Sequence, residues 1–466
     1  MPVDYLSIID RKQLLFKSTS DFIWEHPETA FTEYESAACL LAALREEGFE
    51  VEEGLAGIPT AFLGRFGSGR PVIGILGEFD ALSGLGQESP ATERSPDGKS
   101  CGHGCGHNLL GAASLAAAVA VKAYLESSGK AGTVIYFGCP GEEGGSGKTF
   151  MVRDGVFDGV DAAIGWHPDD ETGVRTKSSL ANCQVLYKFD GTAAHAAIEP
   201  YNGRSALDAM ELMNVGANFL REHIIPDARL HYAITDAGGL SPNVVQPHAE
   251  VLYLIRAPHS SQVSEICSRV DDIARGAALM AGVTSQREFI KACSEVVLNS
   301  TLSQLMYEKM LELGSPEISG HDLAFAREFT KKALASIPGA DPAHPIHAEI
   351  RPYRRGDATV HFGSSDVGDV SWTCPTVQCS AATWVKGTPG HSWQAVAQGK
   401  SQLAYKMSSF AAKAMAATAV ALIDSPDILG RAWEELLART GSGKYVCPIP
   451  DGVRPRALGS IAHENR

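Results

Sequence analysis

The chain has 466 residues, of which 44% are hydrophobic and 20% are charged, so it is long enough for two or three domains around a large core. Asp and Glu outnumber Lys and Arg by 55 to 40, and a net charge of −15 argues against nucleic acid or an anionic membrane surface as the main partner. The N-terminus lacks the apolar run of a secretory signal, and ten scattered cysteines do not form a disulfide scaffold, so we expect a cytoplasmic protein with reduced thiols.

Strands and helices alternate along the first 180 residues. Apolar spacing favours helices over 4–24, 33–47, about 109–125 and 145–155. Apolar, β-branched runs indicate strands at 59–66, 71–82, 133–139 and 160–167. This alternation predicts an α/β sheet that is covered on both faces.

The pattern changes at about Ala181. The segment 183–197 resembles a strand, 203–223 a helix, 249–257 a strand and 261–281 a long helix. We read the whole region as a strand–helix–strand–strand–helix–strand order, which is typical of a small two-layer domain. We therefore predict a catalytic domain over 1–180 and 296–466, interrupted by an inserted α+β, ferredoxin-like domain over 181–295.

The last part of the chain returns to helices. A loop rich in proline and charge is expected near 338–358, and a long alanine-rich helix after His391. The alanine-rich runs 112–121 and 410–423 read as buried helices that are too short to span a bilayer.

The stretch CGHGCGH, residues 101–107, places two cysteines and two histidines in seven residues. All four side chains could bind a structural zinc ion, although strict alternation closes a tetrahedron poorly. The turn could also be a packing element. A third interpretation is that Cys105 and His107, which share one side of an extended chain, belong to a catalytic site completed by distant residues.

Residues suited to complete such a site follow other strands. Glu142 and Glu143 lie in a glycine-rich turn after the strand 133–139, and His167 ends the strand 160–167. His391 lies in a late turn that precedes a helix. Each residue has an ordinary structural explanation, but open α/β sheets build their sites from such positions.

These motifs resemble the dinuclear metal amidohydrolases and carboxypeptidases of the aminoacylase-1 superfamily. The resemblance covers nearly the whole chain and is carried by GEFDAL (77–82), GHGCGHNLLG (102–111), PGEEGGSGK (140–148), GWHPD (165–169), GTAAHAA (191–197), SPNVVQ (241–246), GSSDVGDVSW (363–372) and GTPGHSWQ (387–394). It implies a mixed-sheet metallopeptidase-like catalytic domain, in which the inserted domain acts as a lid and a dimerisation domain.

The resemblance also implies roles for individual residues. Cys105 would bridge two divalent metal ions, manganese or zinc. His107 and His167 would complete the coordination of one ion, and Glu143 and His391 would complete the coordination of the other.

The remaining roles implied by the resemblance are catalytic. Glu142 would be the general base and then the general acid, and Asp80 would orient the metal site from behind. His195 would stabilise the oxyanion, from its own or a partner subunit, and Asn243 and Arg256 would hold the substrate carboxylate. The alternative for Arg256 is a structural salt bridge on an edge strand.

The expected reaction is hydrolysis of the amide bond of an N-acyl or N-aroyl amino acid, such as p-aminobenzoyl-glutamate, by metal-activated water. Hydrolytic deamination or dipeptide cleavage on the same metal centre, and a non-catalytic binding role, are the alternatives. We expect a homodimer through the inserted domain, or a heteromer with a related chain.

Two positions depart from many relatives of this branch. Asn108 stands where many have aspartate, and Glu78 replaces the first aspartate of an Asp-x-Asp motif. Whether Glu78 contacts the metals is left open, as are the roles of Cys101 and His103.

Overall fold

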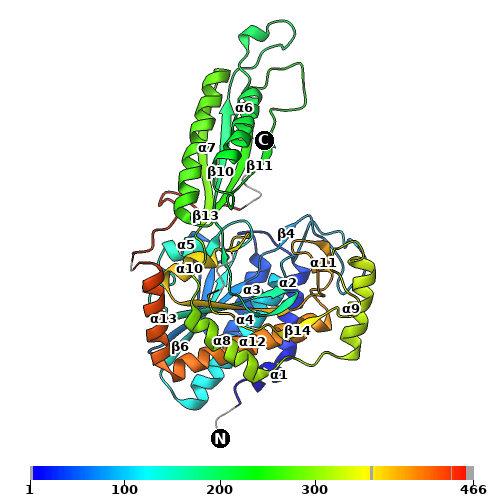
Figure 1. Ribbon diagram of the computed structural model, residues 1–466, viewed down its shortest axis with the longest axis vertical. Coiled ribbons are helices and arrows are strands. Elements are labelled where there is room, and N and C mark those ends of the chain that lie inside the picture. The colour runs from blue at the N-terminus through cyan, green and yellow to red at the C-terminus, as the bar shows by residue number, and fades with distance from the viewer. Residues whose placement is uncertain (1–3, 357–359, 442, 458–466) are drawn as a thin grey trace. The chain divides into compact units, whose positions relative to one another are not determined.

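The computed structural model describes residues 4–356, 360–441 and 443–457. The chain forms two compact units, which are described separately (Figure 1). Unit 1 comprises Met1–Lys177, Val297–Thr359 and Val370–Tyr445, and unit 2 comprises Ser178–Val296, Val360–Asp369 and Val446–Arg466.

Two segments lie in a different unit from the one that the sequence predicted. Residues 360–369 and 446–457, which we assigned to the catalytic domain, belong to unit 2. In the first segment β15 (Val360–His361) pairs with β9 (Ser178–Ser179), and in the second Arg456 forms an ion pair with Glu288. Neither contact has a signature in the local sequence.

Unit 1 is built on an eight-stranded mixed sheet in the order β1-β2-β6-β3-β7-β16-β8-β14. The central strands β6, β3, β7 and β16 are parallel, whereas β2 and β8 run antiparallel to their neighbours in this group. The strands are β1 Glu50–Glu53, β2 Phe62–Ser68, β3 Val72–Glu78, β6 Gly132–Cys139, β7 Ala162–Asp169, β8 Glu171–Val174, β14 His347–Ile350 and β16 Thr376–Ala382; β4 Leu82–Ser83 pairs with β5 Cys101–Gly102. The predicted α/β class with a mixed sheet is confirmed.

Helices cover this sheet on both faces (Figure 1). The helices of unit 1 are α1 Ser7–Arg11, α2 Gln13–Glu25, α3 Tyr34–Glu46, α4 His107–Ser128, α5 Gly147–Arg153, α8 Ser300–Leu313, α9 Gly320–Ala333, α11 Trp393–Val396, α12 Gln402–Asp424 and α13 Pro426–Arg439; α10 Val367–Thr373 continues from unit 2 into unit 1. The helix predicted over 4–24 is instead two helices, because Lys12 leaves helical geometry with φ −103° and ψ 18°.

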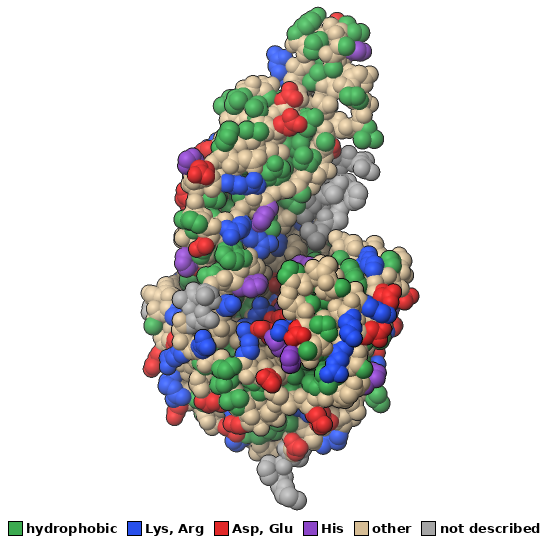
Figure 2. Space-filling view, turned by 45° about the vertical axis from the view of Figure 1, so that its right-hand side comes forward, with side chains coloured by type: hydrophobic (Ala, Val, Ile, Leu, Met, Phe, Trp, Pro, Cys, Tyr) green, Lys and Arg blue, Asp and Glu red, His purple; other side chains and the backbone are tan. Residues whose placement is uncertain are grey.

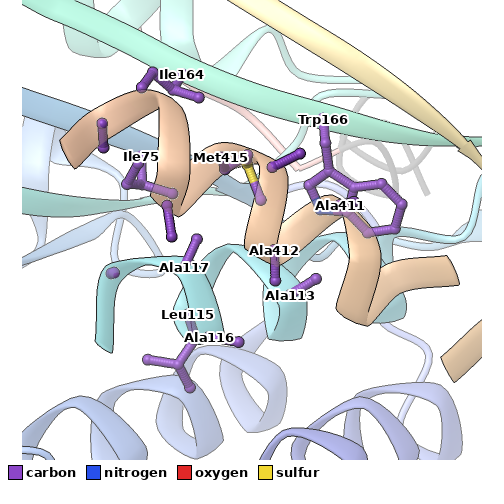
Figure 3. Packing of buried hydrophobic residues seen from close by; sticks show 14 of the residues in the cluster. Ile75, Ala113, Leu115, Ala116, Ala117, Ile164, Trp166, Ala411, Ala412 and Met415 are labelled. Carbon is purple, nitrogen blue, oxygen red and sulfur yellow. The ribbon is translucent and has the colours of Figure 1, made fainter. Parts of the chain in front are cut away.

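The core of unit 1 lies between the sheet and the alanine-rich helices α4 and α12. Figure 3 shows Ala113 and Ala117 of α4 facing Ala411 and Ala412 of α12, with Trp166 of β7 beside them. Small side chains allow the two helices to approach closely, and large sheet residues fill the remaining space.

Both helices are long and apolar enough to cross a membrane by length and composition, so the expectation that they were too short is wrong. Their most apolar windows are, however, 83% and 78% buried inside the structure.

Unit 2 contains a four-stranded antiparallel sheet in the order β11-β12-β10-β13. Its main elements are β10 Ala181–Asp190, α6 Ala206–Leu220, β11 Arg229–Asp236, β12 His248–Ala257, α7 Ser260–Ala281 and β13 Thr284–Cys293. Helices α6 and α7 lie side by side and pack on this sheet (Figure 1). The element order is the strand–helix–strand–strand–helix–strand order expected from the sequence.

We expect Glu435→Gln to destabilise the protein in a pH-dependent way. Glu435 of α13 accepts hydrogen bonds from the backbone N–H groups of Ser300 and Thr301 at the start of α8, at 2.8 and 2.9 Å. Burial raises the pKa of Glu435, but these hydrogen bonds lower it more, to about 2.

The carboxylate therefore contributes stability that is present above its unfolded pKa of about 4.5 and is lost as the pH falls toward 2. Urea unfolding should show a loss of about 1 kcal/mol at pH 7 that shrinks in acid. The neighbouring Glu434→Gln, an exposed position, is the control, and equal losses in both variants would contradict the prediction.

Candidate metal centre

Three parallel strands deliver the site residues to one edge of the unit 1 sheet. Strand β3 ends at Glu78, which pairs in register with Cys139 at the end of β6. Asp80 follows the first strand, the Glu142–Glu143 turn follows the second, and His167 lies near the end of β7. Carboxyl ends of parallel strands share one edge, which is where open α/β sheets carry their sites.

The five predicted metal ligands come together at this edge. The donor atoms of Cys105, His107 and His167 lie within 4.8 Å of one another, and so do those of Cys105, Glu143 and His391. The Cys105 sulfur is thus common to both groups. It lies 3.4 Å from His167 Nε2, while Glu143 Oε1 lies 3.2 Å from His391 Nε2.

The backbone of two turns holds the cysteine and the late histidine together. Gly106 adopts a left-handed conformation, with φ 76°, between Cys105 and the first residue of α4. His391 also has a positive φ, 54°, and its backbone N–H donates to Gly104 O at 3.0 Å. A non-glycine residue in this region is strained, as is common where a side chain must be aimed at a site.

Cys101 and His103 are outside both groups of donor atoms. His103 is buried, its Nε2 hydrogen-bonds to Ile23 O at 3.0 Å, and burial lowers its pKa to about 4. The structure therefore favours the third interpretation of the 101–107 stretch, in which two of its four polar side chains join distant residues. Asn108 is also buried and donates to Ser20 Oγ at 3.0 Å, so it ties α4 to α2.

Asp80 connects two parts of the site from behind, as the resemblance implies. Its Oδ1 accepts from His107 Nδ1 and its Oδ2 from the backbone N–H of Glu143, both at 2.9 Å. The side chain is fully buried, and these hydrogen bonds outweigh burial and keep its pKa low. One carboxylate thus fixes the His107 ring and the position of the acidic turn.

The electrostatics of these residues fit divalent cations. His107 Nε2 is a buried atom without a hydrogen-bond partner among the described residues, and the buried Glu143 Oε1 has an ion-pair contact with His391 Nε2. Burial and the Glu143 carboxylate raise the pKa of the Cys105 thiol well above its usual value, so a thiolate needs a cation beside it. Burial lowers the pKa of His167, which keeps the neutral form that binds metal.

Glu33 is a buried residue of this region that the sequence analysis missed. Its Oε1 accepts from the backbone N–H of Gly141 and its Oε2 from Thr60 Oγ1, both at 2.9 Å. Burial and the nearby Asp80 charge raise its pKa to about 8. Glu33 therefore anchors the turn that carries Glu142 and Glu143. In the sequence it looks like an ordinary helix start, so no local signal could have revealed it.

The other predicted site residues belong to unit 2. His195 bridges to Val244, and the backbone N–H of Ala196 donates to Asn243 O at 3.0 Å, so His195 and Asn243 lie on adjacent segments. His195 Nδ1 accepts from the backbone N–H groups of Ala197 and Ile198.

Arg256 lies on β12, an inner strand of the unit 2 sheet. The edge-strand salt bridge considered from the sequence is therefore wrong. Arg256 donates to Ser364 Oγ at 3.2 Å, and its buried Nε has no hydrogen-bond partner among the described residues. The roles of His195, Asn243 and Arg256 in the reaction stay predictions.

Residues 74–360 match the model of peptidase family M20/M25/M40. The chain belongs to this family. It is 47% identical to the B subunit of p-aminobenzoyl-glutamate hydrolase of Escherichia coli, over 97% of this chain and 98% of that protein. The A subunit of that hydrolase is 31% identical, over 67% of this chain and 70% of its own length. A dinuclear metal-binding M20 peptidase from Bacillus subtilis has the same fold, with a TM-score of 0.54, 16% identity and coverage of 88% of this chain and 99% of that one.

Family membership and the donor set lead to the same function class. The chain is a metal-dependent hydrolase of amide bonds, so the sequence-based prediction of an enzyme of this type is confirmed.

We expect Gly106→Ala to weaken metal binding and stability together. A Cβ at this position would lie 2.9 Å from the Pro168 ring, next to His167, in addition to the strain of a positive φ. Gly84→Ala is the matched control, because Gly84 has a similar φ of 78° but nothing within 4 Å of the added carbon.

Both variants should lose about 1–2 kcal/mol in urea unfolding because of the backbone strain. Only Gly106→Ala should lower metal affinity as well, measured by competition with a chromogenic chelator. Equal metal affinities in the two variants would contradict the prediction, because they would show that the added methyl group at position 106 does not disturb the metal ligands.

Proposed function

We propose that the protein hydrolyses the amide bond of an N-acyl or N-aroyl amino acid, with p-aminobenzoyl-glutamate as the first substrate to test. The observation that carries this proposal is the convergence of Cys105, His107, Glu143, His167 and His391 in a chain so similar to one component of p-aminobenzoyl-glutamate hydrolase. A cytoplasmic location, expected from the sequence, suits such a substrate.

The proposed ligands form two sets that share one sulfur. Cys105 would be shared by both ions, His107 and His167 would hold the first, and Glu143 and His391 would hold the second; the donor atoms of Cys105, His107 and His167, and those of Cys105, Glu143 and His391, lie close enough for this. Thiolate and imidazole suit zinc, and the carboxylate also admits manganese. When bound, such ions lower the pKa of water and polarise the carbonyl oxygen of the substrate.

Glu142 is the proposed proton carrier. A Glu142 carboxylate oxygen lies within 4.8 Å of a ring nitrogen of His107, so this side chain is beside the first set of ligands. It accepts the proton of the attacking water and then delivers it to the leaving nitrogen. Acid–base catalysis of this kind contributes about 10²–10⁴ in rate.

His195 and Arg256 supply the proposed contacts to substrate. Because His195 Nδ1 accepts two backbone N–H groups, the ring proton is assigned to Nε2, which can donate to an oxyanion. Such preorganised donors are worth about 3–4 kcal/mol in the transition state. The half-buried Arg256 side chain would bind the substrate carboxylate with the help of Asn243.

We expect Glu142→Gln to lower kcat about 10²–10⁴-fold, because the amide cannot accept the proton of water. The variant should still retain its metal ions, since Glu142 is outside both proposed ligand sets. Release of p-aminobenzoate and glutamate measures activity, and elemental analysis measures the ions.

Glu126→Gln, a change at an exposed position on α4, is the control. Unchanged hydrolysis in Glu142→Gln would remove Glu142 from the base role. If the metal-loaded wild type hydrolyses none of a panel of acyl and aroyl amino acids, the proposed substrate class is wrong.

We also propose that the protein forms a homodimer through unit 2. The surface of unit 2 carries many exposed hydrophobic side chains (Figure 2). Tyr232 and Ile234, which are 36% and 52% exposed, lie on β11 at an edge of the sheet, where an unpaired strand can join a second copy. A heteromer with a related chain is the alternative, because the Escherichia coli hydrolase has two kinds of subunit.

We expect Ile234→Lys to convert the dimer to monomers, because a charge on the edge strand opposes strand pairing. Size-exclusion chromatography with light scattering measures the mass. Leu311→Lys, at an equally exposed position on α8 of unit 1, is the control. A dimer that survives Ile234→Lys, or a monomeric wild type, would contradict this interface.

A further inference from the structure

Glu78 and Lys148 form a buried ion pair next to the proposed metal ligands. Lys148 Nζ lies 2.6 Å from Glu78 Oε1, and the lysine and glutamate side chains are 0% and 3% exposed. Glu78 is the last residue of β3 and Lys148 lies in the first turn of α5, so two rigid elements fix the pair. A buried pair of this kind is costly to form and needs a reason other than stability alone.

The second oxygen of Glu78 lies close to a proposed ligand atom. Oε2 is 3.4 Å from His107 Nε2, the atom on the opposite side of the ring from Asp80. His107 Nε2 nevertheless has no hydrogen-bond partner among the described residues. The carboxylate and the ring nitrogen thus lie at an ion-pair distance, without a hydrogen bond between them.

This spacing is the one that two ligands of a single ion adopt. Donor atoms that each lie about 2.0–2.2 Å from an ion are about 3–3.5 Å apart. The ligand atoms of Glu78, His107 and Glu142 also lie within 4.8 Å of one another. We propose that Glu78 is a sixth side chain of the metal centre, held by Lys148 so that Oε2 is directed at an ion on His107 Nε2.

The inference rests on the proposed dinuclear site and extends its ligand set. Lys148 binds one carboxylate oxygen and leaves the other aimed at the ion, so the lysine is a positioning residue. Glu78 then adds negative charge to the ion that is otherwise bound by Cys105, His107 and His167.

The test separates a metal ligand from a buried counter-ion. Glu78→Gln/Lys148→Met removes both charges of the pair together, so neither side chain is left as a buried charge without the other, and the variant is expected to fold. Glu78→Asp keeps both charges but withdraws the carboxylate by one methylene. For each, competition with a chromogenic chelator gives the metal affinity, elemental analysis gives the ion count, and urea unfolding of metal-free protein gives the stability.

We expect both variants to bind one of the two ions about 10–100-fold more weakly than the wild type, the range typical of changes around a metal site. Asp322→Asn/Lys406→Met is the control, since it removes another ion pair of unit 1, between the buried Asp322 of α9 and the partly exposed Lys406 of α12. It should alter stability but leave both metal affinities unchanged.

Wild-type affinity for both ions in the double variant, or in Glu78→Asp if the double variant does not fold, would overturn the role of Glu78. A wild type that holds fewer than two ions at saturating metal would instead overturn the dinuclear site, and the proposed function with it. The two failures are therefore distinguishable by the ion count of the unmodified protein.

Discussion

The buried Asp80 carboxylate is the contact on which the arrangement of the site depends. It binds the His107 ring with one oxygen and the backbone of Glu143 with the other. These residues come from a helix start and a strand-end turn that are far apart in the sequence. A single carboxylate thereby holds the ring and the acidic turn at the same point.

The site also concentrates negative charge that protein groups alone do not balance. Glu78, Asp80, Glu142 and Glu143 lie at one sheet edge, and Lys148 pairs with the first of them. A further carboxyl group of this region, Glu33, adds little to this negative charge. Burial and the nearby Asp80 raise its pKa to about 8, so the side chain is largely neutral at pH 7. Divalent cations bound by these side chains would supply further compensation, so that carboxylates and a thiol could share a buried region.

The two alanine-rich helices of the fold make it possible to gather these site residues at one edge of the sheet. Helix α4 begins at His107 and packs against α12 beneath the central strands, so the first residue of a core helix is also a site residue (Figure 3). Close packing of small side chains keeps that helix rigid, and a rigid helix holds the imidazole in place. The geometry of the site therefore depends on the packing of the core.

The sequence by itself determined the α/β class, the main strands and helices, and the motif residues from Cys105 to His391, because hydrophobic period and glycine-rich turns are local signals. It could not reveal that Glu33 anchors the Glu142 turn or that Lys148 pairs with Glu78, since these contacts join segments about 70–110 residues apart. The assignment of 360–369 and 446–457 to unit 2 likewise involves a strand pairing and one ion pair. Only the tertiary structure decides such contacts, because the partner of a buried charge is set by which strand ends the fold brings to the same edge.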